Sequence, residues 1–293
     1  MCPRRCGADR AAGKYGYCGM PEDFYVSRIA PHQWEEPPIS GTRGSGTVFF
    51  TGCNLRCRFC QNREISHERM GTKLTEKELI TRILRLQDTG VHNINLVTPT
   101  HYTVQLALLL EKLKPRLTVP VVWNSGGYDS VDSLRMLEGL VDIYLPDFKY
   151  MSPELSAGLS GATDYAAVAS KAVTEMFRQT GEAIFDGEGL MMKGLIIRHL
   201  VLPGFRKDSI AVLEHIADIL PLDNIRVSVM SQYTPDFASD CEQKSLHRRV
   251  TAFEYQSVLD AADRLGIIGY LQSIDSARLE YTPDFNHGVL TDP

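Results

Sequence analysis

The 293-residue sequence predicts an α/β fold built from repeated strand–helix units, and three observations support this class. Apolar strand-like segments alternate with amphipathic helix-like segments, which is typical of a parallel sheet or barrel with crossover connections. At roughly 150 residues per domain, the length suits two domains or one large barrel. The composition, with 43% hydrophobic and 23% charged residues, is that of an ordinary globular protein.

The periodicity predicts six strands and six helices, two β–α units fewer than a closed eight-unit barrel. The expected strands are residues 47–50, 92–97, 119–123, 142–146, 195–201 and 225–230. The expected helices are residues 75–89, 103–114, 130–139, 165–180, 208–219 and 250–265. Thr75 and Glu78 have the spacing of a capping box at the start of the first helix.

The flanking segments suggest three regions: an N-terminal extension over 1–40, a barrel over 41–270 and a C-terminal tail over 271–293. The prolines of residues 1–40 indicate an extended cap or a small lobe held by a metal. Residues 181–193 are expected to form a hairpin or a loop insertion. The pentapeptide YTPDF occurs at 233–237 and 281–285, either by coincidence or because both copies lie near the site.

Charge and hydropathy exclude two classes of protein. The 31 Lys and Arg residues against 36 Asp and Glu residues give a net charge of −5, so the excess positive charge of a nonspecific nucleic-acid binder is absent. No stretch approaches 18 uninterrupted apolar residues, and the first residues lack the apolar segment of a secretory signal. The sequence therefore predicts a cytoplasmic protein without a membrane span.

The unusual feature of the composition is seven cysteines, three of which lie on one predicted loop. Cys53, Cys57 and Cys60 follow the strand at 47–50 with Cys-x3-Cys-x2-Cys spacing. In a reducing compartment such a group indicates metal or catalytic chemistry before disulfides. Three thiolates can hold an iron–sulfur cluster with one iron left open, or a zinc ion whose fourth ligand comes from elsewhere.

The other cysteines fall into a less complete pattern. Cys2, Cys6 and Cys18 could hold zinc or an auxiliary cluster together with Cys241, His32 or water. Alternatively, they are unliganded thiols or form an incidental disulfide. Cys241 has no other assigned role.

Polar residues follow each predicted strand. Because parallel crossovers keep one handedness, the carboxyl ends of all six strands are expected on one face. The segments at these ends are Cys53–Asn62, Thr98–His101, Asn124–Gly127, Asp147–Lys149, Arg198-His199 with Pro203-Gly204, and Ser231–Tyr233. The sequence predicts that the functional site lies there.

The cysteine spacing, with Phe59 just before the last cysteine, resembles the signature of the radical S-adenosylmethionine (radical SAM) superfamily. This resemblance implies a partial (β/α)6 TIM-like barrel in which Cys53, Cys57 and Cys60 hold a [4Fe–4S] cluster. It also implies that Phe59 packs near the adenine of SAM and that the open iron is chelated by the methionine moiety. The electron donor would be a reduced flavodoxin or ferredoxin, and reductive cleavage of SAM would release a 5′-deoxyadenosyl radical.

Within the superfamily, the segments SGTVFFTGCNLRCRFCQN, TPTHY, YLPDFKY, IIRHLVLPG and MSQY resemble proteins related to pyruvate formate-lyase activating enzyme. The resemblance matches Asp147 and Lys149 to the Asp-x-Lys of activating enzymes, and Asn62 to the Asn after the cluster motif. The activating enzymes' Gly-Gly-Glu-Pro, which holds the SAM amino group, is replaced here by Thr98-Pro99-Thr100-His101. Backbone carbonyls and the Thr98 and Thr100 hydroxyls can still accept hydrogen bonds from an ammonium.

The chemical groups of SAM suggest further contacts. Arg198 suits its carboxylate, and Asn124 and Ser125 suit its ribose hydroxyls. Asp147 and Lys149 would contact the methionine end or form a structural ion pair. His101 and His199 are candidates for either a catalytic or a structural role.

Three functions are compatible with these patterns. The first is a radical enzyme that abstracts a hydrogen atom from a glycine of a partner protein, as activating enzymes do. The second is radical modification of a small metabolite or another macromolecule. The third is a non-catalytic, metal-stapled binding protein on the same scaffold. The sequence does not specify the substrate, the electron donor or the oligomeric state.

Overall fold

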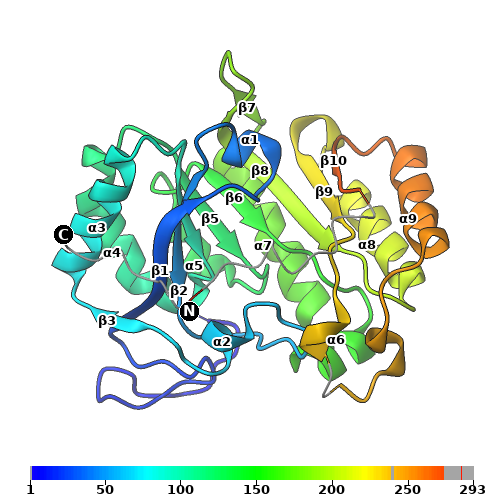
Figure 1. The fold of residues 1–293 in the computed structure, drawn as a ribbon, viewed down its shortest axis with the longest axis horizontal. Coiled ribbons are helices and arrows are strands. Elements are labelled where there is room, and N and C mark those ends of the chain that lie inside the picture. Colours follow the sequence, from blue (N-terminus) through cyan, green and yellow to red (C-terminus); the bar gives the residue numbers. More distant parts are fainter. Residues whose placement is uncertain (1, 239–240, 274–284, 286–293) are drawn as a thin grey trace.

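The structure is a computed structural model that describes residues 2–238, 241–273 and 285. Its centre is a curved ten-stranded sheet with helices on its outer side (Figure 1). Most of the sheet is parallel, in the order β10-β9-β8-β6-β5-β4-β2, and β1 and β3 extend it antiparallel at the β2 end. The parallel strands are β2 Ser45–Phe50, β4 Ile94–Val97, β5 Val121–Ser125, β6 Ile143–Pro146, β8 Met191–Leu200, β9 Arg226–Met230 and β10 Gly269–Leu271.

All six strands predicted from the sequence are present and parallel, which confirms the α/β class. In the described part of the chain the order ends at β10 on one side and β3 on the other, so the sheet is an open, partial barrel. β10 is a seventh parallel strand that the sequence analysis did not predict, because its three residues are too few to give a periodic signal.

The predicted helices are found in the predicted order. The helices that cover the sheet are α3 Glu76–Asp88, α4 Thr103–Leu113, α5 Val131–Arg135, α7 Tyr165–Thr180, α8 Arg206–Ile219 and α9 Ala252–Arg264. The capping box is confirmed: Thr75 Oγ1 accepts from the Glu78 N–H at 3.3 Å, and a Glu78 carboxylate oxygen accepts from the Thr75 N–H at 2.8 Å. The helix predicted over 130–139 ends early, at Arg135, and the chain continues in turns to Gly139, whose φ is 78°.

The N-terminal extension differs from the extended cap that its prolines suggested. Its residues Phe24–His32 form β1, which pairs with β2 on one side and with β3, Thr72–Leu74, on the other. Phe24, Val26 and Ile29 are buried in the core. These apolar side chains therefore favour sheet pairing. The proline within this strand, Pro31, is its penultimate residue, where the ladder tolerates it.

Short elements complete the chain. They include three short helices, α1 Pro37–Ser40, α2 Arg63–Ser66 and α6 Pro153–Ser160. They also include 3-10 turns at Thr100–Tyr102, Lys114–Arg116, Leu222–Asn224, Pro235–Ala238 and Lys244–His247. α6 begins where the Ser152 side chain accepts from the Leu155 N–H, and it ends at left-handed Gly161. The predicted hairpin at 181–193 is confirmed, since β7, Ile184–Phe185, pairs antiparallel with the start of β8.

The features expected of the C-terminal residues stay predictions. Residues 281–284 of the second YTPDF copy, and most of the predicted tail at 271–293, lie outside the described residues. Phe285 is described, and its ring packs against that of Phe49 with the centroids 5.5 Å apart. The division into regions 1–40, 41–270 and 271–293 likewise remains a prediction.

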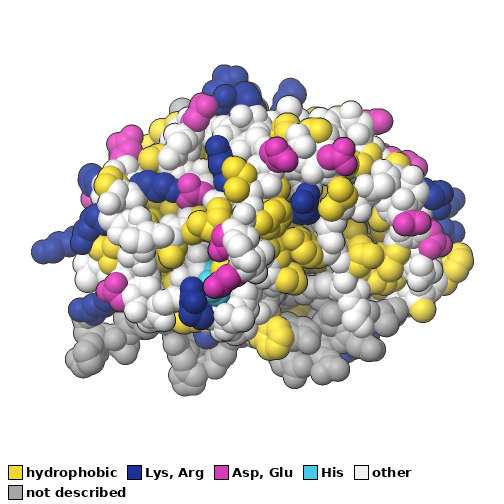
Figure 2. Space-filling model, turned by 90° about the horizontal axis from the view of Figure 1, so that it is seen from above, with side chains coloured by type: hydrophobic (Ala, Val, Ile, Leu, Met, Phe, Trp, Pro, Cys, Tyr) yellow, Lys and Arg dark blue, Asp and Glu magenta, His cyan; other side chains and the backbone are white. Residues whose placement is uncertain are grey.

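Apolar side chains fill the space between the sheet and its helices, with Trp123, Tyr144 and Tyr165 among the largest buried residues. On the face viewed in Figure 2, hydrophobic side chains gather in the middle and many of the Lys and Arg side chains lie towards the rim. In the described part of the chain, no helix is long and apolar enough to cross a membrane.

The capping box gives a stability prediction. We expect Thr75→Ala to lower the free energy of unfolding by about 1 kcal/mol, because the Glu78 N–H at the start of α3 loses its acceptor, the Thr75 hydroxyl. Thr81→Ala is the matched control: Thr81 is exposed inside the same helix, where alanine is the better helix former. Urea denaturation followed by circular dichroism measures both, and an equal or smaller loss for Thr75→Ala would contradict the prediction.

Candidate active site

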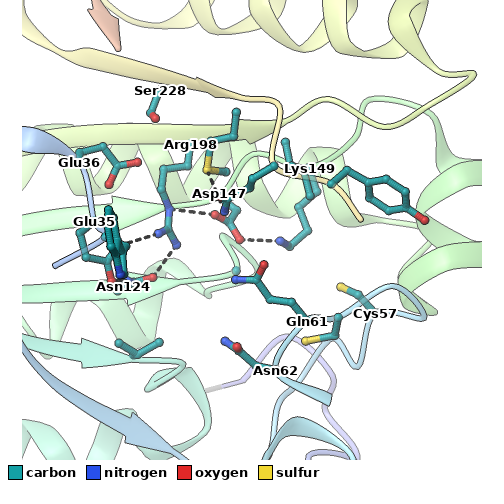
Figure 3. Close-up of a pocket in the computed structure, with 18 of the residues that line it drawn as sticks. Glu35, Glu36, Cys57, Gln61, Asn62, Asn124, Asp147, Lys149, Arg198 and Ser228 are labelled. Carbon is teal, nitrogen blue, oxygen red and sulfur yellow. Dashed lines mark hydrogen bonds and ion pairs between the residues drawn. The ribbon is translucent and has the colours of Figure 1, made fainter. Parts of the chain in front are cut away.

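A pocket of about 530 Å³ lies inside the curve of the sheet (Figure 3). Residues at or just after the ends of the parallel strands line it: Cys53, Cys57, Cys60, Thr98, Asn124, Ser125, Asp147, Lys149, Arg198 and Gln232. The parallel sheet therefore brings together polar segments that are up to about 180 residues apart in the sequence, as the carboxyl-end argument predicted.

The three cysteines of the loop after β2 share this pocket, and each sulfur accepts a hydrogen bond. Cys53 Sγ accepts from the Leu55 N–H at 3.4 Å, and Cys60 Sγ accepts from the Ser66 hydroxyl at 3.4 Å. Cys57 Sγ accepts from the Ser160 hydroxyl at 3.0 Å. The loop is also fastened to the end of α6, because the Arg58 N–H donates to the Leu159 carbonyl at 2.9 Å.

The donor chemistry of these cysteines fits an iron–sulfur cluster. Burial, with the neighbouring thiols of Cys57 and Cys60, raises the pKa of Cys53 to about 12, and burial also raises the pKa of Cys60. Such thiols become thiolates when a cationic centre compensates for the lost hydration. Among the described residues, no three His, Cys, Asp or Glu side chains converge on a single metal ion. A cubane does not need this convergence, because each thiolate binds a different iron.

Phe59 and Asn62 lie beside the cysteines. Phe59 is buried with its ring centroid 6.1 Å from that of Tyr233. Asn62 is at the N-cap position of α2, and its buried side-chain oxygen has no hydrogen-bond partner. Figure 3 shows Gln61 and Asn62 in the space between the cysteines and the charged residues. Asn62 is therefore ready to accept a hydrogen bond from a bound molecule.

Asp147 joins two cations at the centre of the pocket. One carboxylate oxygen accepts from Lys149 Nζ at 2.5 Å, and the other accepts from Arg198 Nε at 3.1 Å. Although burial opposes ionisation, these two cations lower the pKa of Asp147, and the carboxylate in turn raises the pKa of Lys149. Asp147 and Lys149 thus form an ion pair that is also part of the pocket wall.

Arg198, which the sequence suggested as a partner of the SAM carboxylate, is already engaged on three sides by the protein. Besides Asp147, it donates to Glu35 at 3.2 Å and to the Asn124 side-chain oxygen at 2.6 Å. Figure 3 shows the guanidinium between these partners. A buried guanidinium must be neutralised within the fold, so its partners are supplied by the protein.

Asn124 and Ser125 line the pocket but also have internal partners. The Asn124 amide nitrogen donates to Glu35 at 3.2 Å, so this side chain bridges Glu35 and Arg198. The Ser125 hydroxyl donates to Asp129 at 2.6 Å. Both side chains can therefore hold a ligand only with their remaining hydrogen-bonding capacity.

The segment after β4 divides into two parts. Thr98 lines the pocket with a φ of 58°, a left-handed conformation that is unusual for a β-branched residue. Thr100 and His101 are not among the residues that line the pocket. The Thr100 hydroxyl donates to Asp129 at 2.8 Å, and His101 Nε2 lies 2.8 Å from the Thr51 carbonyl.

Both histidines singled out from the sequence are buried outside the pocket lining. His199 Nδ1 lies 2.7 Å from the Phe148 carbonyl. Burial lowers the pKa of His101 to about 3 and the pKa of His199 to about 4. Of the two roles considered, the structural one matches these neutral, buried rings.

The N-terminal cysteines pack beside the Cys53–Cys60 loop. The Cys53 N–H donates to the Cys18 carbonyl at 3.3 Å, and Cys2 Sγ accepts from the Asn54 amide at 3.8 Å. Cys6 is exposed. Arg4 fastens the segment to α6, donating to the Ser160 carbonyl at 2.8 Å and also to the Gly161 carbonyl. Of the two suggested fourth ligands, His32 lines the pocket, and Cys241 is buried with its N–H donating to the Ala238 carbonyl at 2.9 Å.

Several pocket residues were not predicted from the sequence. Trp34, Glu35 and Glu36 enter it from the segment between β1 and α1, and Ser228 enters it from the middle of β9. Ser228 interrupts an apolar strand, as Asn95 does in β4, and that polar interruption was a usable signal. Nothing in the local sequence indicates that Glu35 and Glu36 face the barrel interior.

Comparisons with known proteins agree with this geometry. A sequence model of the radical SAM superfamily matches residues 47–179. An uncharacterized protein of Methanocaldococcus jannaschii is 31% identical over 278 residues, which cover 91% of this chain and 75% of that protein. The crystal structure of methylornithine synthase matches 78% of this chain and 66% of its own, with 16% identity and a TM-score of 0.51. A domain of pyruvate-formate lyase-activating enzyme from Bacteroides vulgatus matches 60% of this chain and 94% of its own, with 9% identity and a TM-score of 0.44.

The match to the family model begins in β2, includes the cysteine loop and continues through β4, β5 and β6 to the end of α7. The similarity to the Methanocaldococcus jannaschii protein extends over most of the chain. The methylornithine synthase structure shows the same kind of fold. The chain therefore belongs to the radical SAM superfamily.

Proposed function

We propose that this protein is an enzyme that cleaves SAM reductively and removes a hydrogen atom from a substrate held in the same pocket. The observation that carries the proposal is the set of three hydrogen-bonded cysteines that line one wall of a pocket also lined by Asn62, Asp147 and Lys149. Membership of the superfamily implies a [4Fe–4S] cluster and SAM as cofactors.

Cys53, Cys57 and Cys60 would hold the cluster, leaving one iron for SAM. When bound, the cluster supplies the electron that cleaves SAM to a 5′-deoxyadenosyl radical, and a reduced flavodoxin- or ferredoxin-type protein would supply that electron. The hydroxyl of Ser160 and the N–H of Leu55 stabilise negative charge on the sulfurs. The loop is thereby held in one arrangement before any cofactor arrives.

Asn62, Thr98 and Lys149 are the residues that we assign to SAM. The unpartnered Asn62 oxygen can accept from an amino group, and the left-handed backbone at Thr98 allows its carbonyl or hydroxyl to do the same. Lys149 has two N–H donors beyond the one given to Asp147, which suits the SAM carboxylate. Phe59 offers an apolar surface for the adenine. Arg198, with three internal partners, acts by holding Asp147 and Asn124 in position.

The apolar part of the lining limits water in the pocket. Phe49, Leu55, Val97, Leu200 and Met230 surround the polar groups. A dry wall protects a reactive radical from side reactions and strengthens the electrostatic contacts inside. The scaffold thus supplies position and exclusion of solvent, while the cofactors supply the reactivity.

Two substrate types fit this proposal. An activating-enzyme role would place a glycine of a partner protein in the pocket, and the open sheet leaves room for a peptide. A small metabolite is the second candidate, and the charged residues Glu35 and Glu36 favour it because they line the pocket wall opposite Cys57 (Figure 3). A non-catalytic, metal-stapled protein would instead bind zinc stably and leave SAM intact.

Anaerobic reconstitution tests the proposal directly. We expect about four irons per chain at the pocket cysteines and, with dithionite, conversion of SAM to 5′-deoxyadenosine. Iron beyond four, or bound zinc, that is lost in a variant with alanine at Cys2, Cys6 and Cys18 would indicate a second metal site there. A stable zinc site without SAM cleavage would refute the enzymatic proposal.

Removal of one pocket cysteine should separate cofactor binding from folding. We expect Cys57→Ala to lose the cluster and SAM cleavage but to keep the circular dichroism spectrum, because the loop lies at the strand ends and outside the sheet. Cys241→Ala is the control, since this buried cysteine does not line the pocket. Iron analysis and circular dichroism measure the two effects, and loss of the folded spectrum in Cys57→Ala would contradict the prediction.

The Ser160 hydroxyl should tune the cluster. We expect Ser160→Ala to shift the reduction potential to more negative values, because a hydrogen bond to a ligand sulfur stabilises the reduced, more negative cluster. Ser156→Ala is the matched control in the same helix, since its hydroxyl donates to the Pro153 carbonyl. Potentiometric titration followed by electron paramagnetic resonance measures the potential, and equal potentials in the two variants would disprove this role.

The activating-enzyme role has its own test. Incubation with SAM, reductant and a glycyl-radical enzyme that co-purifies with this protein should produce a protein radical visible by electron paramagnetic resonance. If 5′-deoxyadenosine forms while no protein radical appears, the substrate is not that glycine, and the small-metabolite candidate is favoured.

A further inference from the structure

We propose that Glu36 is the group that recognises the substrate and that the substrate class is a small molecule with a protonated amine. This inference rests on the proposed function, because it names what occupies the pocket beside SAM. Glu36 lies between β1 and α1, and Figure 3 shows it on the side of Arg198 opposite Cys57.

The Glu36 carboxylate is incompletely satisfied. The residue is 8% exposed, and its Oε2 atom is buried without a hydrogen-bond partner among the described residues. The Ser228 hydroxyl interacts with the carboxylate, and burial raises the pKa of Glu36 above its usual value. A buried carboxylate oxygen without a partner costs free energy, and a ligand N–H would remove that cost.

The two neighbouring acids, Glu35 and Asp147, differ from Glu36 because protein side chains already donate hydrogen bonds to their carboxylates. Glu35 accepts from Arg198 at 3.2 Å, from Asn95 at 3.0 Å and from Asn124 at 3.2 Å. Asp147 accepts from both Lys149 and Arg198. Within the described part of the chain, Arg198 acts on Glu36 through its charge, but its hydrogen bonds go to Glu35, Asp147 and Asn124.

The charge of the pocket points to the same missing group. With every acid ionised, its described lining contains three carboxylates, Glu35, Glu36 and Asp147, against two cations, Lys149 and Arg198. The remaining basic side chain, His32, is neutral at pH 7, because burial and Arg28 lower its pKa to about 4. One positive charge on the ligand would balance the lining.

The surroundings of Glu36 suit an ammonium group. Trp34 and Tyr270 line the same pocket. Burial raises the pKa of Tyr270, and the charge of the Glu36 carboxylate contributes to this rise. Aromatic faces beside a carboxylate are a favourable environment for an organic cation. A pocket of about 530 Å³ is also in the usual range for small ligands.

A matched pair of probes tests the charge requirement. Isothermal titration calorimetry, done anaerobically on the full chain reconstituted with iron and sulfide and saturated with SAM, compares hexylamine with 1-hexanol. The two have the same chain length, and only hexylamine is charged at pH 7. We expect hexylamine to bind at least about tenfold more tightly than the alcohol. Equal affinities would overturn the inference.

Variants locate the effect. Glu36→Gln should weaken hexylamine binding by about tenfold and leave the affinity for 1-hexanol almost unchanged. Glu188→Gln removes the same charge from an exposed position outside the lining and should change neither affinity. Ser228→Ala should also weaken hexylamine binding and leave the affinity for 1-hexanol almost unchanged, and it gives an independent reading if Glu36→Gln unfolds. An unchanged preference for the amine in the folded Glu36→Gln variant would refute the role of Glu36.

The same experiments separate this inference from the proposed function. SAM cleavage by the unaltered protein without any amine tests the proposed function alone. If SAM is cleaved but hexylamine is not preferred over hexanol, only the substrate assignment fails. If SAM is not cleaved, titration of the metal-free chain still shows whether Glu36 selects an amine. Preferential binding of a glycine-containing peptide over hexylamine would favour a protein substrate and overturn the small-molecule assignment.

Discussion

The guanidinium of Arg198 is largely buried inside the barrel, with 16% of the side chain exposed, and the arrangement of the pocket depends on how this charge is neutralised. An unpaired charge in such a place costs several kcal/mol, so the protein must supply partners. They come from three separate segments: Asp147 after β6, Asn124 at the end of β5 and Glu35 after β1. The network thereby ties the N-terminal extension to the centre of the parallel sheet.

This constraint explains why the segment before the barrel belongs to the site. β1 continues the sheet beyond β2, and the chain that follows it carries Glu35 to Arg198 and Glu36 to Ser228. Without that segment, Arg198 would lose one of its carboxylates and the pocket would lose one wall. The segment that matches the family model contains the cysteine loop and Asp147, whereas Glu35 and Glu36 come from the chain before it.

The cysteine loop is stabilised by a second set of contacts that does not involve the charged network. α6 provides the Ser160 hydroxyl to Cys57 and the Leu159 carbonyl to Arg58, and Arg4 fastens the end of this helix to the N-terminal segment. These contacts hold the three thiols in one wall of the pocket in the folded chain. The proposed chemistry therefore needs two rigid parts, a sulfur-rich wall and a charged wall, with the ligands between them.

The sequence alone determined the six parallel strands and most of the helices, because apolar periodicity and capping residues act locally. It also determined the cysteine loop and the polar strand ends, since their spacing is visible in the linear chain. It also suggested Thr100 and His101 as SAM contacts, whereas in the structure their side chains bond to Asp129 and the Thr51 carbonyl. Only the tertiary structure could show that Arg198 is shared by Glu35, Asp147 and Asn124 and that Glu36 Oε2 is buried without a hydrogen-bond partner among the described residues. Those properties depend on which side chains meet across the barrel, and the burial that gives each charge its cost exists only in the folded protein.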